Sequence, residues 1–303
     1  MRIFITGGTG FIGRHVVKEL RLKGHQLMLL TRQPKAAALY EEAAGTVKTV
    51  RGGLSEIDNW KSEVDSFYPE AAIHMAWESI PNYDTKTSVK NLKYGLDLIE
   101  MLADIGCKSV ISTGSCWEYG EQSGSLGEEM PLKPFNAFSA AKNELHCLGR
   151  EIARERSMQF IWTRLFYVYG PGQKDSSLIP YIINCALKGE KPKVKTPHAK
   201  NDFIYVSDVG KAISAIVTFR HNSYEIYNIG SGYSTSVQEI IKIVCEKLNR
   251  PCEKRVPDGV NNNSYDNFWA DISRVKKHLN FEPRTSIADG IDKMILSINP
   301  NQH

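Results

Sequence analysis

Apolar residues in the first half of the chain fall into short runs that alternate with longer segments of helical spacing. The short runs predict strands, and the segments whose apolar positions recur every three to four residues predict helices between them. The predicted strands are Arg2–Thr6, Gln26–Thr31, Thr46–Arg51, Ala71–Ala76, Ser109–Thr113 and Gln159–Phe166. The predicted helices are Phe11–Lys23, Ser88–Asp104 and Ala137–Glu155.

This regular alternation predicts the fold class. Strands separated by helices require right-handed parallel crossovers, and these place helices on both faces of the sheet. The expected fold is therefore α/β, with a doubly wound parallel sheet of Rossmann type. After Tyr169 the pattern loosens, because glycine and proline recur in Gly170-Pro171-Gly172 and again at 188–192. We expect the second half to add a smaller C-terminal lobe.

Composition and charge exclude several classes of protein. The 303 residues are 42% hydrophobic and 24% charged, which is typical of an ordinary folded protein. A net charge of +4 is too small for the clustered basic face that nucleic-acid binding requires. No apolar run reaches the roughly 18 residues of a membrane span. The chain opens on a strand-like run rather than a signal peptide, so we expect a cytoplasmic location and no membrane partner.

The cysteines form no C-x-x-C pair, and no histidine cluster stands near them to complete a zinc site. We therefore expect reduced, mostly packed thiols and no metal. The residues concerned are Cys107, Cys116, Cys147, Cys185, Cys245 and Cys252.

Three glycines spaced three residues apart stand between the first predicted strand and the first predicted helix. In Gly7, Gly10 and Gly13, one glycine permits a tight turn and one lets a pyrophosphate approach the backbone. The third lets the helix pack closely on the strand, with the phosphate at the helix N-terminus. The flanking strand and helix favour a dinucleotide site over a merely glycine-rich turn.

The end of the second predicted strand helps to distinguish NAD from NADP. An NAD site usually places an acidic residue there for the adenosine ribose hydroxyls, but this chain has Thr31 followed by Arg32. The Arg32 guanidinium, with Arg14 as a second candidate, is suited to a 2′-phosphate, which favours NADP and leaves NAD as the alternative. A solvated surface arginine is the other interpretation of Arg32.

With these features the chain resembles the extended short-chain dehydrogenase/reductase family of NAD(P)-dependent nucleotide-sugar epimerases, dehydratases and reductases. The resemblance rests on several signatures that occur in the order of the family. They are the glycine turn, His74-Met75-Ala76, Asn91, Ser112–Gly120, Arg164–Gly172, Asp202–Asp208 and Tyr227–Gly232.

The resemblance implies a catalytic serine after the fifth strand and a tyrosine four residues before a lysine on the next helix. Ser115 and Lys142 match this pattern, but the tyrosine position holds Phe138. A spacing of four puts both residues on one helix face, where the ammonium would lower a phenol's pKa and bind the nicotinamide ribose. Phenylalanine keeps the shape and removes the acid, so binding should survive better than turnover.

Three explanations for Phe138 stay open. It is a substitution made to trap a ligand complex, a natural variant in which another group supplies the proton, or the mark of a binding protein without redox activity. For the second explanation Tyr167 is the preferred candidate, because the family usually has asparagine there. A changed pocket shape is the simpler interpretation of Tyr167. Tyr119 is less attractive, because the family often has tyrosine there for packing.

The resemblance also implies a set of binding residues. Those expected to hold the cofactor are Gly7, Thr9, Gly10, Phe11, Ile12, Gly13, Thr31, Arg32, Gly53, Leu54, Met75, Ala76, Trp77, Asn91, Thr113 and Lys142. Those expected to contact the substrate are Trp77, Ser115, Cys116, Trp117, Tyr167, Ser177, Leu178, Lys200 and Asn201. The family often has an adenine-binding carboxylate at position 53, so a backbone contact is expected there instead.

The second lobe of this family binds a nucleotide diphosphate. Ser177 and Leu178 resemble the helix entrance that meets the base and ribose. Where the family usually has a basic residue this chain has Asn201, so Lys200 either substitutes for it or is a solvated loop lysine. The resemblance implies a Rossmann domain at 1–168 that also receives 203–232, and a substrate-binding lobe at 169–202 and 233–303.

We expect NADP(H)-dependent reduction of a keto group on a nucleotide-linked sugar, with a deoxysugar favoured. An NAD-dependent 4-epimerase or 4,6-dehydratase is the alternative enzyme, although Cys116-Trp117 stands where the family's dehydratases have Asp-Glu. A non-catalytic protein that binds dinucleotide and sugar nucleotide is the alternative of another class. Relatives dimerise through helices that correspond to Ser88–Asp104 and Ala137–Glu155, so a homodimer is expected by analogy.

Overall fold

The computed structural model describes residues 1–33, 46–219, 224–250 and 267–298. The chain divides into two compact units. The first unit comprises Met1–Gly120, Pro131–Leu165 and Gly210–Tyr227, and the second comprises Glu121–Met130, Phe166–Val209 and Asn228–His303. Cys252 lies outside the described residues, and Cys107, Cys116, Cys147, Cys185 and Cys245 are free thiols.

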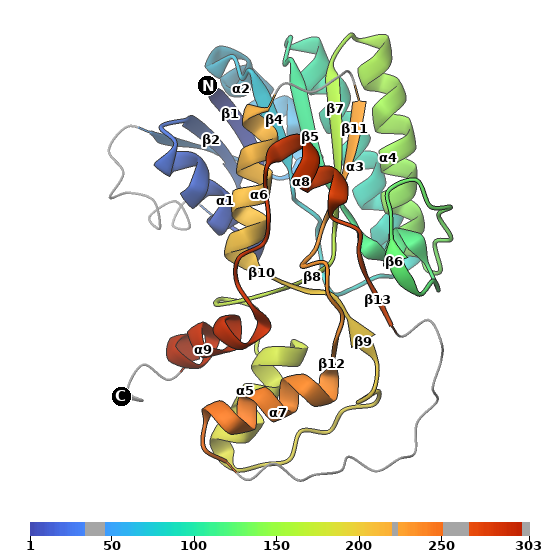
Figure 1. Ribbon diagram of the computed structural model, residues 1–303. Helices are drawn as coiled ribbons and strands as arrows, with labels where there is room; N and C mark the ends of the chain where they lie inside the picture. Colours follow the sequence, from blue (N-terminus) through green and yellow to red (C-terminus); the bar gives the residue numbers. More distant parts are fainter. Residues whose placement is uncertain (34–45, 220–223, 251–266, 299–303) are drawn as a thin grey trace. The chain divides into compact units, whose positions relative to one another are not determined.

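A seven-stranded sheet forms the centre of the first unit, in the order β11-β7-β5-β4-β1-β2-β3 (Figure 1). The pairings from β7 through β5, β4, β1 and β2 to β3 are all parallel. This order confirms the predicted doubly wound α/β fold, because strands on either side of β1 are reached by crossovers in opposite directions. The strands are β1 (Arg2–Thr6), β2 (Gln26–Thr31), β3 (Val47–Arg51), β4 (Ala71–His74), β5 (Ser109–Ser115), β7 (Gln159–Leu165) and β11 (Tyr224–Ile229).

Helices cover both faces of this sheet, which explains why its central strands are continuous apolar runs. On one face, side chains of α2 (Ile57–Phe67), α3 (Thr85–Asp104) and α4 (Ala137–Glu155) share a core with the strands. On the other face, α1 (Phe11–Leu22) packs through Val17 near Ile5 and Leu29, and Gly210 of α6 (Val206–Thr218) approaches the backbone of His15.

Some element boundaries differ from the sequence prediction. Helix α2 is not predicted at all, although Ile57, Trp60, Val64 and Phe67 have the spacing of one helix face and pack on the core. Helix α3 begins three residues earlier than predicted, at Thr85, because the Asp84 carboxylate accepts a hydrogen bond from Thr87 N at 2.7 Å and caps the helix. Strand β4 ends at His74, two residues before the predicted end, and β5 continues to Ser115.

The second unit is built around three helices that share an apolar core, namely α5 (Leu178–Lys188), α7 (Val237–Lys247) and α9 (Ile287–Ile298). Short strand pairs accompany them: β8 (Tyr167–Tyr169) with β10 (Phe203–Tyr205), β9 (Lys200–Asn201) with β12 (Thr235–Ser236), and β6 (Gly124–Leu126) with β13 (Phe268–Ala270). Helix α8 covers Ser273–Leu279.

Two buried carboxylates tie segments of this unit together. Asp202 accepts hydrogen bonds from the backbone N–H groups of Ser231, Gly232 and Ala270, at 2.6 to 3.0 Å. Asp208 accepts from the backbone of Arg284 and Thr285. A buried carboxylate with several N–H donors is stable without a cation, because the donors replace its hydration. Asp208 therefore anchors the segment that contains Arg284 and Thr285.

Among the described residues, no helix combines the length and apolarity that crossing a bilayer demands. The same residues contain no group of three or more histidine, cysteine, aspartate or glutamate side chains arranged to hold a metal ion.

Candidate active site

The glycine turn between β1 and α1 fits a pyrophosphate. Gly7 has φ of +75°, and a Cβ at Gly13 would collide with the Gly7 carbonyl oxygen, so both positions exclude a larger side chain. Gly10 is the N-cap of α1, and it offers no side-chain cap. The first turn of α1 also carries no acidic residue. The positive end of the helix is thus arranged for an anion, which matches the diphosphate of a dinucleotide.

The adenosine end of this region is more open. Arg32 follows β2 with its side chain 71% exposed, and its Nη1 lies 3.6 Å from the Glu78 carboxylate. The Gly53 N–H donates to the Glu56 carboxylate at 3.0 Å, and Leu54 is buried. The expected backbone contact from Gly53 to adenine would compete with this internal hydrogen bond. The Thr31 hydroxyl bonds locally with the backbone of Gln33.

The segment that follows β4 is held from both sides. Met75 N donates to the Thr6 carbonyl at 3.1 Å and Ala76 N to the Thr6 hydroxyl at 3.4 Å. The buried Asn91 amide accepts from Glu78 N at 2.7 Å and donates to the carbonyls of Glu78 and Thr87. Asn91 therefore positions this segment, and its expected contact with the cofactor stays a prediction.

Ser115 ends β5 and opens the short 3₁₀ turn Cys116–Tyr119. Its Oγ accepts a hydrogen bond from Trp117 N at 3.2 Å, so the hydroxyl proton is left to point elsewhere. Its backbone N–H donates to Oε1 of Glu118 at 2.8 Å. These reciprocal bonds form a capping box that fixes the serine side chain, while Cys116 is buried beneath it.

Glu118 is itself a fully buried carboxylate at the end of β5. It pairs with Nε of Arg164 at 2.9 Å and accepts from Trp162 Nε1 at 3.1 Å. The side chains of Glu118 and Arg164 are 0% and 2% exposed. A Cβ at Gly114 would collide with both Glu118 and Trp162, so glycine is needed beside this pair. The ion pair and the capping box together hold the Ser115 turn on the sheet.

Lys142, on α4, lies in an almost dry environment. Its Nζ donates to the Thr113 carbonyl at 2.7 Å and lies 4.1 Å from the centre of the Trp77 ring. Burial lowers the pKa of Lys142 to about 7, and the charge of Glu118 only partly opposes this shift. Burial, together with the charge of Lys142, lowers the pKa of the neighbouring His74 to about 3, so the imidazole is neutral.

Phe138 lies at the centre of an aromatic cluster that comprises Trp77, Tyr83, Trp117, Phe135 and Phe138. Its ring centre is 5.4 Å from that of Trp77, 5.0 Å from Tyr83 and 5.8 Å from Trp117. Phe135 joins through Trp117 at 5.5 Å. The Phe138 ring also lies 6.0 Å from Lys142 Nζ. The structure thus places Phe138 and Lys142 on one face of α4, as the helix spacing predicts, and Trp117 connects Phe138 to the turn that holds Ser115.

The two tyrosines considered as proton donors have different surroundings. Tyr119 is fully buried, and its hydroxyl accepts from Nη1 of Arg164 at 3.3 Å, which makes it part of the packing around the ion pair. Tyr167 belongs to the second unit, where its ring lies 5.7 Å from Phe203 and 6.1 Å from Phe268. A catalytic role for Tyr167 stays a prediction.

The remaining predicted substrate residues also belong to the second unit. Ser177 is the N-cap of α5 and Leu178 its first residue. The Ser177 side chain makes no cap hydrogen bond. Lys200 and Asn201 form β9, where Lys200 is exposed. Their contacts with a nucleotide stay predictions.

Residues 3–230 match the model of the NAD dependent epimerase/dehydratase family. The chain belongs to this family. The predicted resemblance to extended short-chain dehydrogenases/reductases of nucleotide sugars is thereby confirmed. At 26% identity, the chain is similar to the dTDP-4-dehydro-6-deoxyglucose reductase of Escherichia coli over 98% of this chain and 97% of that protein.

Solved structures share the fold. The UDP-glucose 4-epimerase of Thermotoga maritima, solved with UDP-glucose, has a TM-score of 0.87 at 22% identity, covering 100% of both chains. The UDP-glucuronic acid 4-epimerase of Bacillus cereus, solved with UDP-glucuronic acid and NAD, has a TM-score of 0.86 at 21% identity, covering 99% of both chains.

For this member of the epimerase/dehydratase family, sequence reasoning missed three residues of the site. Glu118 stood inside the noted segment Ser112–Gly120, and the charge of Arg164 within an apolar predicted strand indicated that a buried partner of opposite charge was needed. Glu78 is visible only through its contact with Arg32. Tyr83 lies in a loop rich in proline and asparagine, where no periodicity indicates burial.

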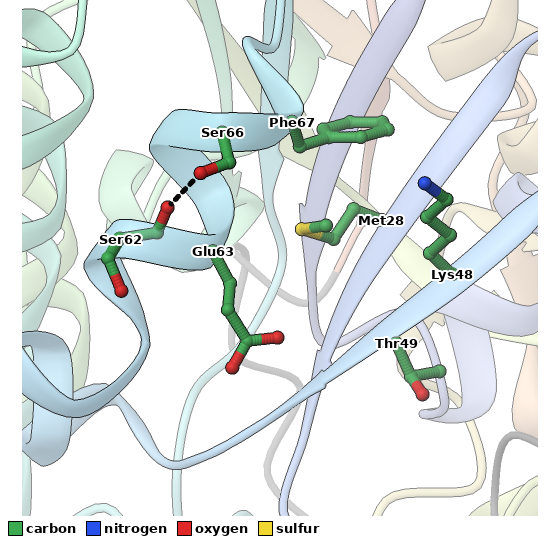
Figure 2. Close-up of a pocket in the computed structure, with 7 residues that line it drawn as sticks. All are labelled: Met28, Lys48, Thr49, Ser62, Glu63, Ser66 and Phe67. Atoms are coloured by element: carbon green, nitrogen blue, oxygen red, sulfur yellow. Dashed lines mark hydrogen bonds between the residues drawn. The ribbon is translucent and has the colours of Figure 1, made fainter.

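A separate hollow lies between β3 and α2 (Figure 2). Its lining residues are Met28, Lys48, Thr49, Ser62, Glu63, Ser66 and Phe67, none of which is a predicted site residue. Figure 2 shows Ser66 bonded to the Ser62 carbonyl, at 2.8 Å, so that hydroxyl is already used within its helix. This hollow forms no part of the candidate active site.

Proposed function

We propose that this epimerase/dehydratase family member is an NADP(H)-dependent reductase of a keto group on a nucleotide-linked deoxysugar. The observation that carries the proposal is the end of β2, where a guanidinium and no carboxylate follows Thr31. An exposed arginine at this position is suited to a 2′-phosphate, the group that separates NADP from NAD. The similarity to a dTDP-4-dehydro-6-deoxyglucose reductase supports the reductive direction.

The residues of the first unit fit such a cofactor. The N-terminus of α1 would hold the diphosphate, and Lys142 would hold the nicotinamide ribose, because Nζ uses one of its protons on Thr113 and keeps others for hydroxyls. When bound, NADPH supplies the hydride. The Ser115 hydroxyl accepts from Trp117 N and so directs its own proton outward, where it would hydrogen-bond the substrate carbonyl.

The substrate lobe would be the second unit. Ser177 and Leu178 at the start of α5, with Lys200 and Asn201 on β9, are the residues proposed to meet the nucleotide diphosphate. Lys200 is the cation among them, and a diphosphate needs positive charge nearby. Trp77, Cys116 and Trp117 of the first unit are further residues proposed to meet the sugar, and Tyr167 is the corresponding candidate of the second unit.

The test is oxidation of NADPH with a nucleotide-linked 4-keto-6-deoxyhexose as the substrate. The loss of NADPH absorbance measures the rate, and product analysis identifies the sugar that forms. We expect kcat/KM with NADPH to exceed that with NADH at least about tenfold, because a charge-assisted contact is worth about 1.5–3 kcal/mol. The same free sugar without its nucleotide serves as the control and should not react. Purified protein that carries stoichiometric NAD, with no gain in affinity from a 2′-phosphate, would contradict the proposal.

One observation favours an NAD-dependent epimerase as the second candidate. The Glu78 carboxylate pairs with Arg32 at 3.6 Å, and it would oppose a 2′-phosphate while tolerating ribose hydroxyls. The epimerase of Bacillus cereus was solved with NAD. This candidate predicts interconversion of UDP-sugars without net consumption of dinucleotide, which product analysis separates from reduction.

We further propose a homodimer and a cytoplasmic location. Helices α3 and α4 pack together, and each exposes an apolar side chain, Val89 at 58% and Leu148 at 45%. The described cysteines are free thiols, as in a reducing compartment. Sedimentation that finds a monomer at micromolar concentration would contradict the dimer, and fractionation outside the cytoplasm would contradict the location.

A further inference from the structure

Reduction of a ketone needs a proton as well as a hydride. The hydride converts the carbonyl oxygen into an alkoxide, and a positioned acid that protonates it accelerates the reaction by about a hundred- to ten-thousand-fold. Phe138 carries no such proton. This inference rests on the proposed function, and it concerns which group of the first unit takes over the proton transfer.

Tyr83 is the phenol nearest to the Phe138 ring in the aromatic cluster. Its ring centre lies 5.0 Å from that of Phe138 and 5.2 Å from that of Trp117. Trp117 is the residue whose N–H fixes Ser115 Oγ, and Phe138 lies beside Lys142 Nζ. Tyr83 therefore contacts the two rings that flank the candidate catalytic serine and lysine.

The loop that carries Tyr83 is fastened at both ends. On one side, Asn82 N donates to the Ser79 carbonyl at 2.6 Å and Glu78 N donates to Asn91. On the other side, the Asp84 carboxylate accepts from Asn82 Nδ2 and caps α3. A phenol between two such anchors is held in place before substrate arrives, which is what general acid catalysis requires.

The other protic groups nearby serve other purposes. The Ser115 hydroxyl is suited to hydrogen bonding, because its pKa lies far above that of a phenol. The Lys142 ammonium donates to Thr113 and faces the Trp77 ring, and its remaining protons are those proposed above to hold the nicotinamide ribose. Tyr119 is buried against Arg164. Tyr83 is partly exposed, so among these groups it combines an acidic O–H with access to a ligand.

We propose that Tyr83 is the catalytic residue that donates the proton to the substrate oxygen in place of the tyrosine absent at position 138. As hydride adds to the carbonyl carbon, the π electrons move to oxygen, the O–H bond of Tyr83 breaks and a new O–H bond forms on the product alcohol. The phenolate left behind regains a proton from solvent water. Burial raises the pKa of Tyr83, which keeps its O–H protonated in the resting site and leaves the position of the phenol to carry the donor role.

The kinetic test compares Tyr83→Phe, Phe138→Tyr and the double variant with the wild type, using the nucleotide-linked 4-keto-6-deoxyhexose and NADPH. Tyr83→Phe should lower kcat by about a hundred- to ten-thousand-fold with KM changed less than about threefold. The kcat of the double variant should exceed that of Tyr83→Phe at least about tenfold, because Phe138→Tyr returns a phenol to the helix. Tyr68→Phe, on an exposed tyrosine, is the matched control and should keep full activity.

Full activity in Tyr83→Phe would overturn the proposal and leave Lys142 or Tyr167 as the donor. Loss of activity without recovery in the double variant would also count against it, provided that thermal unfolding shows each variant folded. A structural defect at position 83 predicts that KM and Tm change together with kcat, whereas loss of an acid changes kcat alone.

A second measurement does not depend on turnover. 3-Fluorotyrosine placed at position 83 reports the surroundings of the phenol by ¹⁹F NMR during titration with NADP⁺ and then with UDP-glucose. We expect the resonance to shift as the ligands occupy the site, and an unchanged resonance at saturation would overturn the placement of Tyr83. If the wild type reduces no keto sugar but the resonance shifts, the proposed reaction fails while Tyr83 remains a ligand-facing group.

Discussion

The two ends of the expected cofactor site are built in different ways. At the nicotinamide end, Lys142 is 4% exposed, and Ser115 and Phe138 are fixed by hydrogen bonds and packed rings. At the adenosine end, the Arg32 side chain is 71% exposed and has a carboxylate 3.6 Å away as its recorded ion-pair partner. The buried groups at the nicotinamide end are held in place before substrate binds, as catalysis requires. The choice between NAD and NADP at the adenosine end instead depends on exposed charges that water and salt screen.

This difference should appear in the size of mutational effects. Removing one charge of a buried ion pair leaves its partner charged without hydration, which lowers the free energy of unfolding. Removing one charge of an exposed pair costs little, because water then hydrates the partner. Changes at the buried end should therefore alter stability, and changes at the exposed end should alter only the preference for a ligand.

The largest effect on stability is expected from Glu118→Ala. This change leaves the buried Arg164 without its carboxylate and releases the Ser115 turn, so unfolding free energy should fall by about 3–5 kcal/mol. Urea denaturation measures the change. The matched control is Glu151→Ala, which removes an exposed pair with Arg154 and should cost less than about 1 kcal/mol. Equal losses in the two variants would contradict the contrast.

A second prediction uses the pH dependence of stability without cofactor. The pKa of Lys142 is lowered from 10.5 to about 7 in the folded state, so the unfolded chain binds more protons between these values and stability rises with pH across that window. The stability present at high pH is lost as the pH falls through 7. As the pH rises, the free energy of unfolding of the wild type should increase relative to that of Lys142→Met by up to about 1.4 kcal/mol per pH unit.

Urea denaturation at several pH values from 7 to 10 measures this difference. Lys142→Met keeps the length and packing of the side chain against Trp77 while removing the charge, so other titrating groups cancel in the comparison. Parallel stability curves for the two proteins would show that Lys142 keeps an ordinary pKa.

The smallest effects are expected at the adenosine end. Arg32→Ala should weaken NADP⁺ binding by about tenfold and leave NAD⁺ binding within about twofold, because only the 2′-phosphate is lost as a partner. Glu78→Gln should strengthen NADP⁺ binding about two- to threefold, since a screened repulsion is removed. Calorimetric titration of both dinucleotides measures these preferences. A drop of similar size for NAD⁺ in Arg32→Ala would mean that the guanidinium holds something other than the 2′-phosphate.

Local sequence signals predicted most of the first unit because its central strands are buried on both faces. Ile3, Phe4 and Ile5 are all 0% exposed, and such runs stand out without any knowledge of tertiary contacts. The glycine turn was equally readable, since its backbone geometry admits no other residue. Helix α2 was missed although its apolar residues Ile57, Trp60, Val64 and Phe67 recur with helical spacing, so the local signal was present there too.

The sequence predicted those features of the site that depend on one helix or strand alone. The spacing of Phe138 and Lys142 on α4 and the place of Ser115 after β5 follow from local structure. The pairing of Glu118 with Arg164 joins residues 46 positions apart, and the contact of Tyr83 with Phe138 joins a loop to a helix. Such contacts depend on packing between elements, which no local pattern contains. The roles expected for Tyr167 and Lys200 stay predictions.

The close packing around Gly114 limits the order in which neighbouring residues can be substituted during evolution. Any side chain at position 114 would meet the Glu118 carboxylate and the Trp162 indole. A lineage can therefore enlarge residue 114 only after both Glu118 and Trp162 have become smaller, and a return to either residue is then blocked until glycine is restored. Descendants of this protein that retain Glu118 and Trp162 should therefore also retain Gly114, whereas a retained glycine places no such constraint on residue 118.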